Sequence, residues 1–302
     1  MLVFAATIVA GIGCERSAPA GAGVVPPPAT PHRIVVLSPA LAVTLKDLGL
    51  AGEVAGRHAH DMVLDKSVPV CGDQTGIDYE ALLGARPTHV LIEWGTRELP
   101  RRLGELAREH GWVVRSYGAL LTLDQVRASV DDLGREFLAP EKQGAREKLL
   151  ARLDASWARR EELSKAGRVL LLMGTSPVCA ALGPGSFHQQ VLERIGGVPA
   201  IREGSPYMEL DAEDVARLAP EGIVLVMPRA VGAAPRTGPL SADDAAARLG
   251  ALATLKIPAV TNGRVWLIDD PLCLLPGTSL AGFADDLERG LARWSSGEKP
   301  GG

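Results

Sequence analysis

The stretch that decides the fold runs from Thr122 to Lys165 and reads TLDQVRASVDDLGREFLAPEKQGAREKLLARLDASWARREELSK. It carries no strand signal, whereas the chain on either side alternates short aliphatic runs with amphipathic stretches. Thr122 and Gln125 have the spacing of a capping box, which predicts a helix running towards Pro140. A second helix is predicted from about Glu141 to Lys165, on the order of 35 Å long. The pattern therefore predicts a helical connector between two halves.

The two flanking halves carry the strand signals. Short runs rich in Val, Ile and Leu predict strands, and helical patterns separate them, which is typical of α/β layers. The expected strands are Arg33–Ser38, His89–Trp94 and Trp112–Tyr117 before the connector, and Arg168–Gly174, Gly222–Met227 and Arg264–Asp269 after it. We therefore expect the α/β class, with two α/β (Rossmann-like) lobes joined by one long spine helix.

Composition suggests the domain boundaries. Residues 15–31 are rich in Ala, Gly and Pro, a composition that cannot bury a core and predicts a flexible linker. We expect an N-terminal lobe at 32–120, connecting helices at 121–166 with the spine at about 141–165, a C-terminal lobe at 167–296 and a tail at 297–302.

The first fourteen residues predict export. An apolar run from Leu2 to Gly13 has the length of a signal-peptide core and is too short to span a bilayer as a helix. Gly11, Gly13 and Cys14 resemble a bacterial lipoprotein processing site, in which Cys14 is lipidated. A plain cleaved signal, a buried strand and a misplaced start codon are the alternatives. The expected location is the periplasm or the outer face of the cytoplasmic membrane, with a lipid anchor.

Charge and composition exclude several classes of protein. Of 302 residues 46% are hydrophobic, and 32 Lys+Arg against 36 Asp+Glu leave a net charge of -4. This is not the electrostatic footprint of a nucleic-acid binder. Four cysteines are too few for a disulfide scaffold. A bridge between Cys179 and Cys273 and a set of free buried thiols both stay open.

The two halves also share a local pattern. Glu80 stands seven residues before Pro87, and Glu213 stands seven residues before Pro220. In each half the glutamate falls in the first turn of a predicted helix, and the proline precedes a predicted strand. The match favours a duplicated pair, although acidic residues favour first turns in any case.

Five segments in order resemble a known family, the helical-backbone (class III) ABC-transporter periplasmic substrate-binding proteins. They look closest to the cobalamin-binding members, with ferric-siderophore and haem binders as relatives, and the likeness covers about Arg33 to Trp294. The segments are Arg33–Pro39, Gly76–Ile92, Gly183–Phe187, Gln190–Gly197 and Leu255–Pro258.

The resemblance implies a function and a set of partners. A ligand cleft between the lobes would capture a metal chelate (a corrinoid, haem or ferric siderophore) and deliver it to an ABC permease and its ATPase. It implies a monomer that is not an enzyme and holds no resident cofactor. A metal-handling enzyme or chelatase on the same scaffold is the alternative. No Gly-x-Ser-x-Gly elbow supports a hydrolase, because Gly174-Thr-Ser-Pro lacks the second glycine.

Six residues are candidates for contacts to the ligand. His58 and His60 flank Ala59 just after a further stretch with a strand signal, where ligands of α/β proteins collect. Their imidazoles are either metal-ligating or ordinary surface groups. The resemblance places His60, Trp94 and Tyr207 at aromatic cleft positions, whereas Gln74 stands where a tryptophan is expected. No protein metal site is assigned. The predicted ligand-binding residues are His58, His60, Trp94, Ser176, Tyr207 and Asp270.

The resemblance also assigns Glu80 and Glu213 to permease docking, one in each lobe. The alternative is that both are ordinary first-turn acids.

Overall fold

The computed structural model describes residues 32–95, 98–176 and 178–297. Residues from His32 onward form one compact unit. The predicted signal with Cys14, the linker at 15–31 and the tail beyond Gly297 lie outside the described residues. In the part of the chain that is described, no helix is long and apolar enough to cross a membrane.

The first sheet, sheet A, has five parallel strands in the order β3-β2-β1-β4-β5. Alternate residues of its central strand point to opposite faces. Ile34 and Val36 pack into one core, and Val35 and Leu37 into another. The elements are β1 (Ile34–Leu37), α1 (Pro39–Asp47), the 3-10 helix η1 (Ala51–Glu53), β2 (Val54–His58), β3 (Val70–Gly72), α2 (Tyr79–Ala85), β4 (His89–Glu93), α3 (Arg101–His110) and β5 (Val113–Tyr117).

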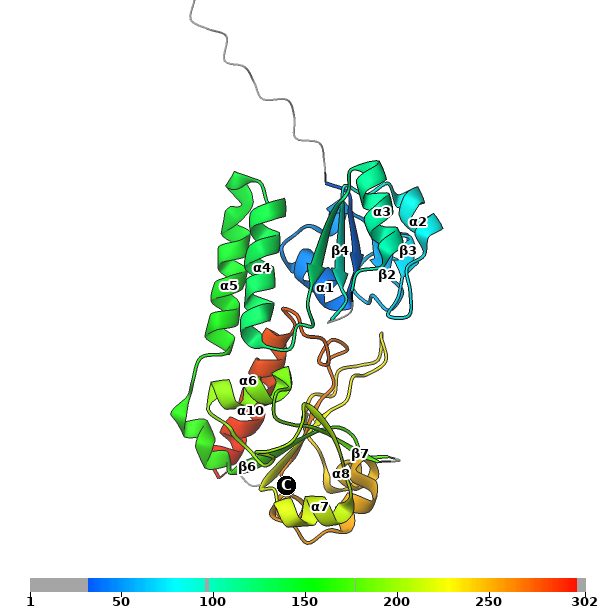
Figure 1. Ribbon diagram of the computed structural model, residues 1–302. Helices are drawn as coiled ribbons and strands as arrows, with labels where there is room; N and C mark the ends of the chain where they lie inside the picture. The colour runs from blue at the N-terminus through cyan, green and yellow to red at the C-terminus, as the bar shows by residue number, and fades with distance from the viewer. Residues whose placement is uncertain (1–31, 96–97, 177, 298–302) are drawn as a thin grey trace, which may run out of the picture. The chain divides into compact units, whose positions relative to one another are not determined.

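The connector is helical, as predicted. Helix α4 (Leu123–Phe137) begins at a complete capping box, because the Thr122 hydroxyl and the Gln125 side chain each accept a backbone N–H of the other residue. Helix α5 (Gln143–Ser156) lies beside α4 (Figure 1). The short 3-10 helices η2 (Pro140–Lys142) and η3 (Glu161–Ala166) stand at its two ends.

The predicted spine helix from Glu141 to Lys165 is wrong. Helix α5 stops at Ser156, so it is about 21 Å long rather than 35 Å. Trp157 is buried, and its indole N–H donates to the Leu280 carbonyl at 3.5 Å. Arg160 is extended, with φ −131° and ψ 104°.

Tertiary contacts replace the helical hydrogen bonds that this break removes. The Arg160 backbone N–H donates to the Ile195 carbonyl at 2.9 Å, and its guanidinium donates to the Ala155 and Ala158 carbonyls. The same guanidinium pairs with Glu288 at 2.7 Å. These contacts hold the chain out of the helix, although the sequence contains neither glycine nor proline at this point.

The second sheet, sheet B, is mixed. Its order is β11-β12-β10-β6-β7-β9, with β8 beside β6. β12, β10, β6 and β8 run parallel, whereas β7, β9 and β11 each pair with a neighbour in antiparallel fashion. The elements are β6 (Arg168–Gly174), β7 (Cys179–Leu182), α6 (Phe187–Ile195), β8 (Val198–Pro199), β9 (Tyr207–Leu210), α7 (Ala212–Leu218), β10 (Gly222–Val226), β11 (Gly238–Pro239), α8 (Ala242–Leu249), η4 (Gly250–Thr254), α9 (Pro258–Thr261), β12 (Val265–Ile268) and α10 (Leu280–Ser295).

One core cluster contains residues from both sheets. It takes Ile34 and Val36 from sheet A, Val169 and Val224 from sheet B, and buried residues of α1, α4, α6 and α10. The opposite face of sheet B packs on a separate cluster beneath α7 and α8, to which Leu170 belongs. The two halves are therefore joined by continuous apolar packing as well as by the connector.

The predicted repeat is present in the backbone. Helices α2 and α7 are each seven residues long and begin at an aspartate cap, and each ends at a residue in the left-handed region. These end residues are Arg86 (φ 47°) and Ala219 (φ 42°), and they are the described non-glycine residues with positive φ. Arg33 donates to the Arg86 carbonyl at 3.0 Å, and Arg168 donates to the equivalent Ala219 carbonyl at 3.1 Å. The same local design thus precedes a parallel strand in each half.

Candidate functional site

Three of the predicted ligand residues line one pocket at the carboxyl end of sheet A. His58 ends β2, His60 follows two residues later and Trp94 follows β4. Parallel strands bring these points to one edge of the sheet, where ligands of α/β proteins bind. This sheet A pocket has a volume of about 330 Å³ and is lined by Leu37, Ser38, Pro39, His58, His60, Asp73, Gln74, Glu93 and Trp94.

The two histidines of the sheet A pocket lie 5.5 Å apart between ring centroids. The backbone N–H of His60 donates to Nδ1 of His58 at 3.1 Å, so a neutral His58 carries its proton on Nε2. His58 is buried, and burial is the main cause that lowers its pKa, followed by the charge of His60. The charges of Asp73 and Asp61 raise the pKa of His58 and so partly oppose this shift. The structure thus favours a neutral imidazole at position 58.

His60 has the opposite arrangement. Its Nδ1 lies 3.0 Å from the Gln74 side-chain oxygen, so Nδ1–H donates and the lone pair is on Nε2. Nε2 has no hydrogen-bond partner among the described residues. Gln74, noted in the sequence as a departure from an expected tryptophan, therefore orients the His60 ring.

Ser38 and Glu93 were not predicted as site residues. The Ser38 hydroxyl donates to Oε2 of Glu93 at 2.7 Å and also caps α1 by accepting the Leu41 N–H. The Leu120 N–H reaches the other Glu93 oxygen at 3.4 Å. Ser38 follows an apolar strand and Glu93 ends one. Their position at strand ends is the sequence signal that could have marked them as site residues. They give the pocket a fixed carboxylate beside its imidazoles.

The other three predicted ligand residues lie elsewhere. Ser176 is exposed in a bend after β6. Tyr207 is 52% exposed at the start of β9, three residues before the end of the strand, where Leu210 pairs with Cys179. Asp270 lines a separate hollow of about 600 Å³ between α1, α5 and α10. The structure does not bring these three residues into the sheet A pocket.

Several exposed apolar side chains lie at or after the carboxyl ends of parallel strands in the sequence. Most of the large exposed hydrophobic residues in the described ranges occupy such places, in contrast to the charged surface of the helices. In sheet A these are Met62, Leu99 and Leu121, and in sheet B they are Met173, Val178 and Val231. Val231 is 72% exposed. Such residues suit a ligand with a large apolar surface.

The loop that carries Val231 is built on one buried carboxylate. Asp269 is 3% exposed and accepts the Arg236 backbone N–H at 2.9 Å and the Thr237 hydroxyl at 2.7 Å. Its carboxylate also pairs with Arg229 at 3.4 Å. The base of the loop at 229–236 is therefore fixed while its apolar tip is exposed.

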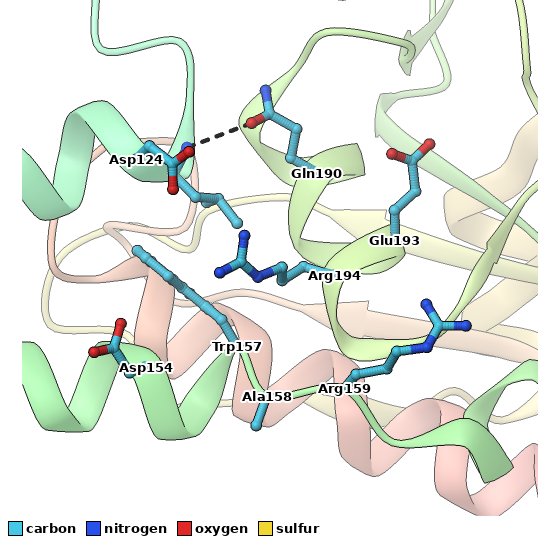
Figure 2. A pocket seen from close by; sticks show the side chains of 9 residues that line it. Asp124, Asp154, Trp157, Ala158, Arg159, Gln190, Glu193 and Arg194 are labelled. Carbon is cyan, nitrogen blue, oxygen red and sulfur yellow. Dashed lines mark hydrogen bonds between the residues drawn. The ribbon is translucent and has the colours of Figure 1, made fainter.

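A hollow of about 640 Å³ lies where α4 begins, α5 ends and α6 passes (Figure 2). Gln190 of α6 accepts the Leu123 N–H there at 3.4 Å, drawn as the dashed line. Although this hollow is larger than the sheet A pocket, Asp154 pairs with Arg127, and Trp157 is buried. No predicted ligand residue lines it, so we assign the site to the sheet A pocket.

Glu80 and Glu213 are both exposed, in the first turns of α2 and α7. Within the described ranges neither carboxylate takes part in an ion pair. They stand at equivalent points of the repeated helices, and their role in permease docking stays a prediction.

Cys71, Cys179 and Cys273 are free and buried, so a bridge between Cys179 and Cys273 is absent from the structure. Cys179 and Cys273 belong to different core clusters, on opposite faces of sheet B. Among the residues the structure describes, no group of three His, Cys, Asp or Glu side chains is placed to hold a metal ion.

The protein has two sheets with a helical connector and a pocket at the carboxyl edge of a parallel sheet. This is the fold of the two-lobed periplasmic binding proteins, as the resemblance predicted. Several solved structures share it. The periplasmic heme-binding protein BhuT in complex with two hemes aligns with a TM-score of 0.65 and 23% identity, over 87% of this chain and 99% of that one.

Two proteins of Vibrio cholerae are similar in the same way. The periplasmic heme-binding protein HutB aligns with a TM-score of 0.66 and 18% identity over 87% of this chain and 98% of that one. The periplasmic vitamin B12-binding protein BtuF aligns with a TM-score of 0.64 and 18% identity over 87% and 97%. No protein-family model matches the sequence, and the comparison with curated proteins gives no match. The likeness is one of fold.

Proposed function

We propose that the protein is the extracytoplasmic substrate-binding component of an ABC importer, and that it captures a metal chelate such as a corrinoid, haem or ferric siderophore. The observation that carries the proposal is the sheet A pocket, where His58, His60 and Trp94 meet at the carboxyl edge of a parallel sheet. Imidazoles are ligands for iron and cobalt, and an indole packs well against a flat ring.

Exposed apolar side chains in both halves support this ligand class. Apolar side chains follow the carboxyl ends of strands in both sheets, and the loop with Val231 presents a further apolar tip. Proteins of the same fold bind heme or vitamin B12. A large macrocycle with an apolar face and a central metal has the complementary chemistry.

We further propose that the protein works at the outer face of the cytoplasmic membrane. Cys14 would carry the lipid, and the linker at 15–31 would tether the folded unit. Cys14→Ser should release the protein from the membrane fraction while leaving ligand binding unchanged, and an unchanged distribution would reject the lipid anchor.

The proposed delivery to the permease rests on Glu80 and Glu213. Their equivalent positions on α2 and α7 suit a partner made of two similar halves.

The proposal is tested with protein purified from its own host. Its visible absorption spectrum should show bands of a bound corrinoid or haem, and calorimetric titration with haemin, a corrinoid and a ferric siderophore should show saturable binding of at least one. A colourless protein that binds none of the three would refute the function. Catalytic insertion of a metal into a free porphyrin would support the chelatase alternative.

A further inference from the structure

The two imidazoles of the sheet A pocket are not equivalent as metal ligands. A metal binds the lone pair of a ring nitrogen that carries no proton. In His58 that lone pair is on Nδ1 and already accepts the His60 N–H at 3.1 Å. In His60 the Nδ1 proton donates to Gln74 at 3.0 Å, and the lone pair is on Nε2. The geometry therefore leaves one available nitrogen donor.

One nitrogen donor is too few for a bare ion but enough for a metal that a macrocycle already holds. A bare ion such as Zn²⁺ takes about four ligands, and the described residues offer no group of three suitable side chains. Haem iron or a corrin cobalt has four equatorial nitrogens from its own ring, so one protein atom can complete an axial position. The pocket thus matches a chelated metal.

We infer that His60 binds the metal of a macrocyclic chelate through Nε2 and that Gln74 is its positioning residue. The inference rests on the proposed function and narrows its substrate class to metalloporphyrins or corrinoids with an exchangeable axial position. The Nε2 lone pair forms a coordinate bond to the metal, and a bound water or hydroxide leaves. The oxidation state of the metal does not change.

The same step excludes one of the three chelate types. A ferric siderophore that supplies six oxygen donors has no open position for an imidazole. Trp94 lines the same pocket, and stacking of its indole on a ring face would not depend on the metal. Ring binding and metal ligation are therefore separable by experiment.

The experiment titrates the full chain with haemin and, in parallel, with metal-free protoporphyrin. Wild type should show the electron paramagnetic resonance and absorption signature of an imidazole-ligated ferric haem. His60→Ala should lose that signature and regain it with added imidazole, and its haemin affinity should fall about a hundredfold, whereas metal-free protoporphyrin should bind both proteins within about twofold. His60 is exposed, so its truncation leaves the core intact.

Gln74→Leu tests the positioning role. It removes the acceptor for Nδ1–H, so haemin affinity should fall about tenfold while metal-free protoporphyrin binds as in wild type. Gln74→Glu keeps an acceptor and should retain the imidazole signature.

The outcomes separate the inference from the function on which it rests. Haemin binding with identical spectra in wild type and His60→Ala would overturn the inference and leave the function standing. Tight binding of a six-oxygen ferric siderophore with no binding of haemin or corrinoid would also overturn the inference and leave the proposed function standing. Failure of wild type to bind any chelate would overturn both.

Discussion

Acid should destabilise this protein through one buried histidine. His188, the second residue of α6, is 1% exposed, and its ring packs against Phe187 and Phe283 at centroid distances of 4.1 and 5.0 Å. Its Nε2–H donates to the Cys273 carbonyl at 2.8 Å, and Nδ1 has no partner. Burial lowers its pKa from the ordinary 6.5 to about 4, although the bond to Cys273 acts in the opposite direction.

The sign and size of the effect follow from that shift. Between pH 6.5 and pH 4 the unfolded chain binds a proton at His188 that the folded protein does not, so stability is complete above pH 6.5 and is lost as pH falls towards 4. The full loss is about 3 kcal/mol. At pH 5 the unfolded imidazole is mostly protonated and the folded one mostly neutral, so the loss is about 2 kcal/mol.

His188→Gln isolates this contribution, because the glutamine amide can still donate to the Cys273 carbonyl but does not titrate. Urea unfolding at several pH values from 8 to 5 should show wild type losing about 2 kcal/mol more than His188→Gln. Phe283→Leu, which weakens the same packing without removing a titrating group, should run parallel to wild type. Parallel curves for wild type and His188→Gln would refute the reasoning.

Three further outcomes are expected. Glu80→Ala with Glu213→Ala should bind the ligand and melt nearly as wild type but lose about 2 to 5 kcal/mol of binding to the permease, measured as stimulated transporter ATPase. Asp243→Ala, which removes another exposed first-turn acid, is the matched control. If the double variant of Glu80 and Glu213 stimulates the transporter ATPase as wild type does, the docking role is rejected. Asp269→Ala should cost about 1 to 3 kcal/mol in urea unfolding, because it removes the buried carboxylate that accepts hydrogen bonds from Arg236 and Thr237. It should also speed proteolysis within 229–236, and unchanged proteolysis would contradict the anchoring role. A thiol reagent at pH 8 should modify the cysteines of the native protein far more slowly than those of the urea-unfolded chain. The reason is that burial raises the thiol pKa to about 11 in Cys71, about 11 in Cys179 and about 12 in Cys273. Equal rates would contradict their burial.

Five of the six strands predicted from sequence contain a buried apolar run, and β5 is the exception, with only half-buried and exposed residues. All six expected strands are confirmed to within one residue at each end. In β6 and β10 successive residues face core clusters on both sides of the sheet, so nearly every position needs an apolar side chain. The sequence therefore contains a continuous apolar run that predicts the strand. The predicted capping box at Thr122 is confirmed for the related reason that its hydrogen bonds are local.

Short edge strands leave no such run. β8 and β11 contain two residues each, and β9 has exposed and buried positions without a clear period. Their pairing depends on neighbours that are distant in the chain. β11, for example, exists because Gly238 and Pro239 lie beside β12.

The site was predictable where it depends on strand ends and unpredictable where it depends on partners across the fold. Trp94 follows a strand whose end the sequence reveals, whereas β2, which His58 ends, is not among the six strands predicted with bounds. The hydrogen bond from Ser38 to Glu93 spans 55 residues, and that from His60 to Gln74 joins two loops. Tyr207 was assigned by resemblance alone, and the register of β9 with β7 determines its distance from the strand end.

The broken spine shows why a strong local pattern can still mislead. Leu149, Leu153 and Trp157 are spaced by four, and the residues after them favour helix, so intrinsic propensity continues to Lys165. A continuous helix, however, would remove the hydrogen bond of the Arg160 N–H to the Ile195 carbonyl and the close approach of Gly196 to Arg160, where an added Cβ would lie 2.5 Å from the Arg160 oxygen. Per-residue helix propensities differ by only a few tenths of a kcal/mol, whereas a buried hydrogen bond and a salt bridge at 28% exposure each contribute about 1 kcal/mol. The tertiary contacts therefore decide where the helix ends, and the glycine that permits them lies 36 residues further along the chain.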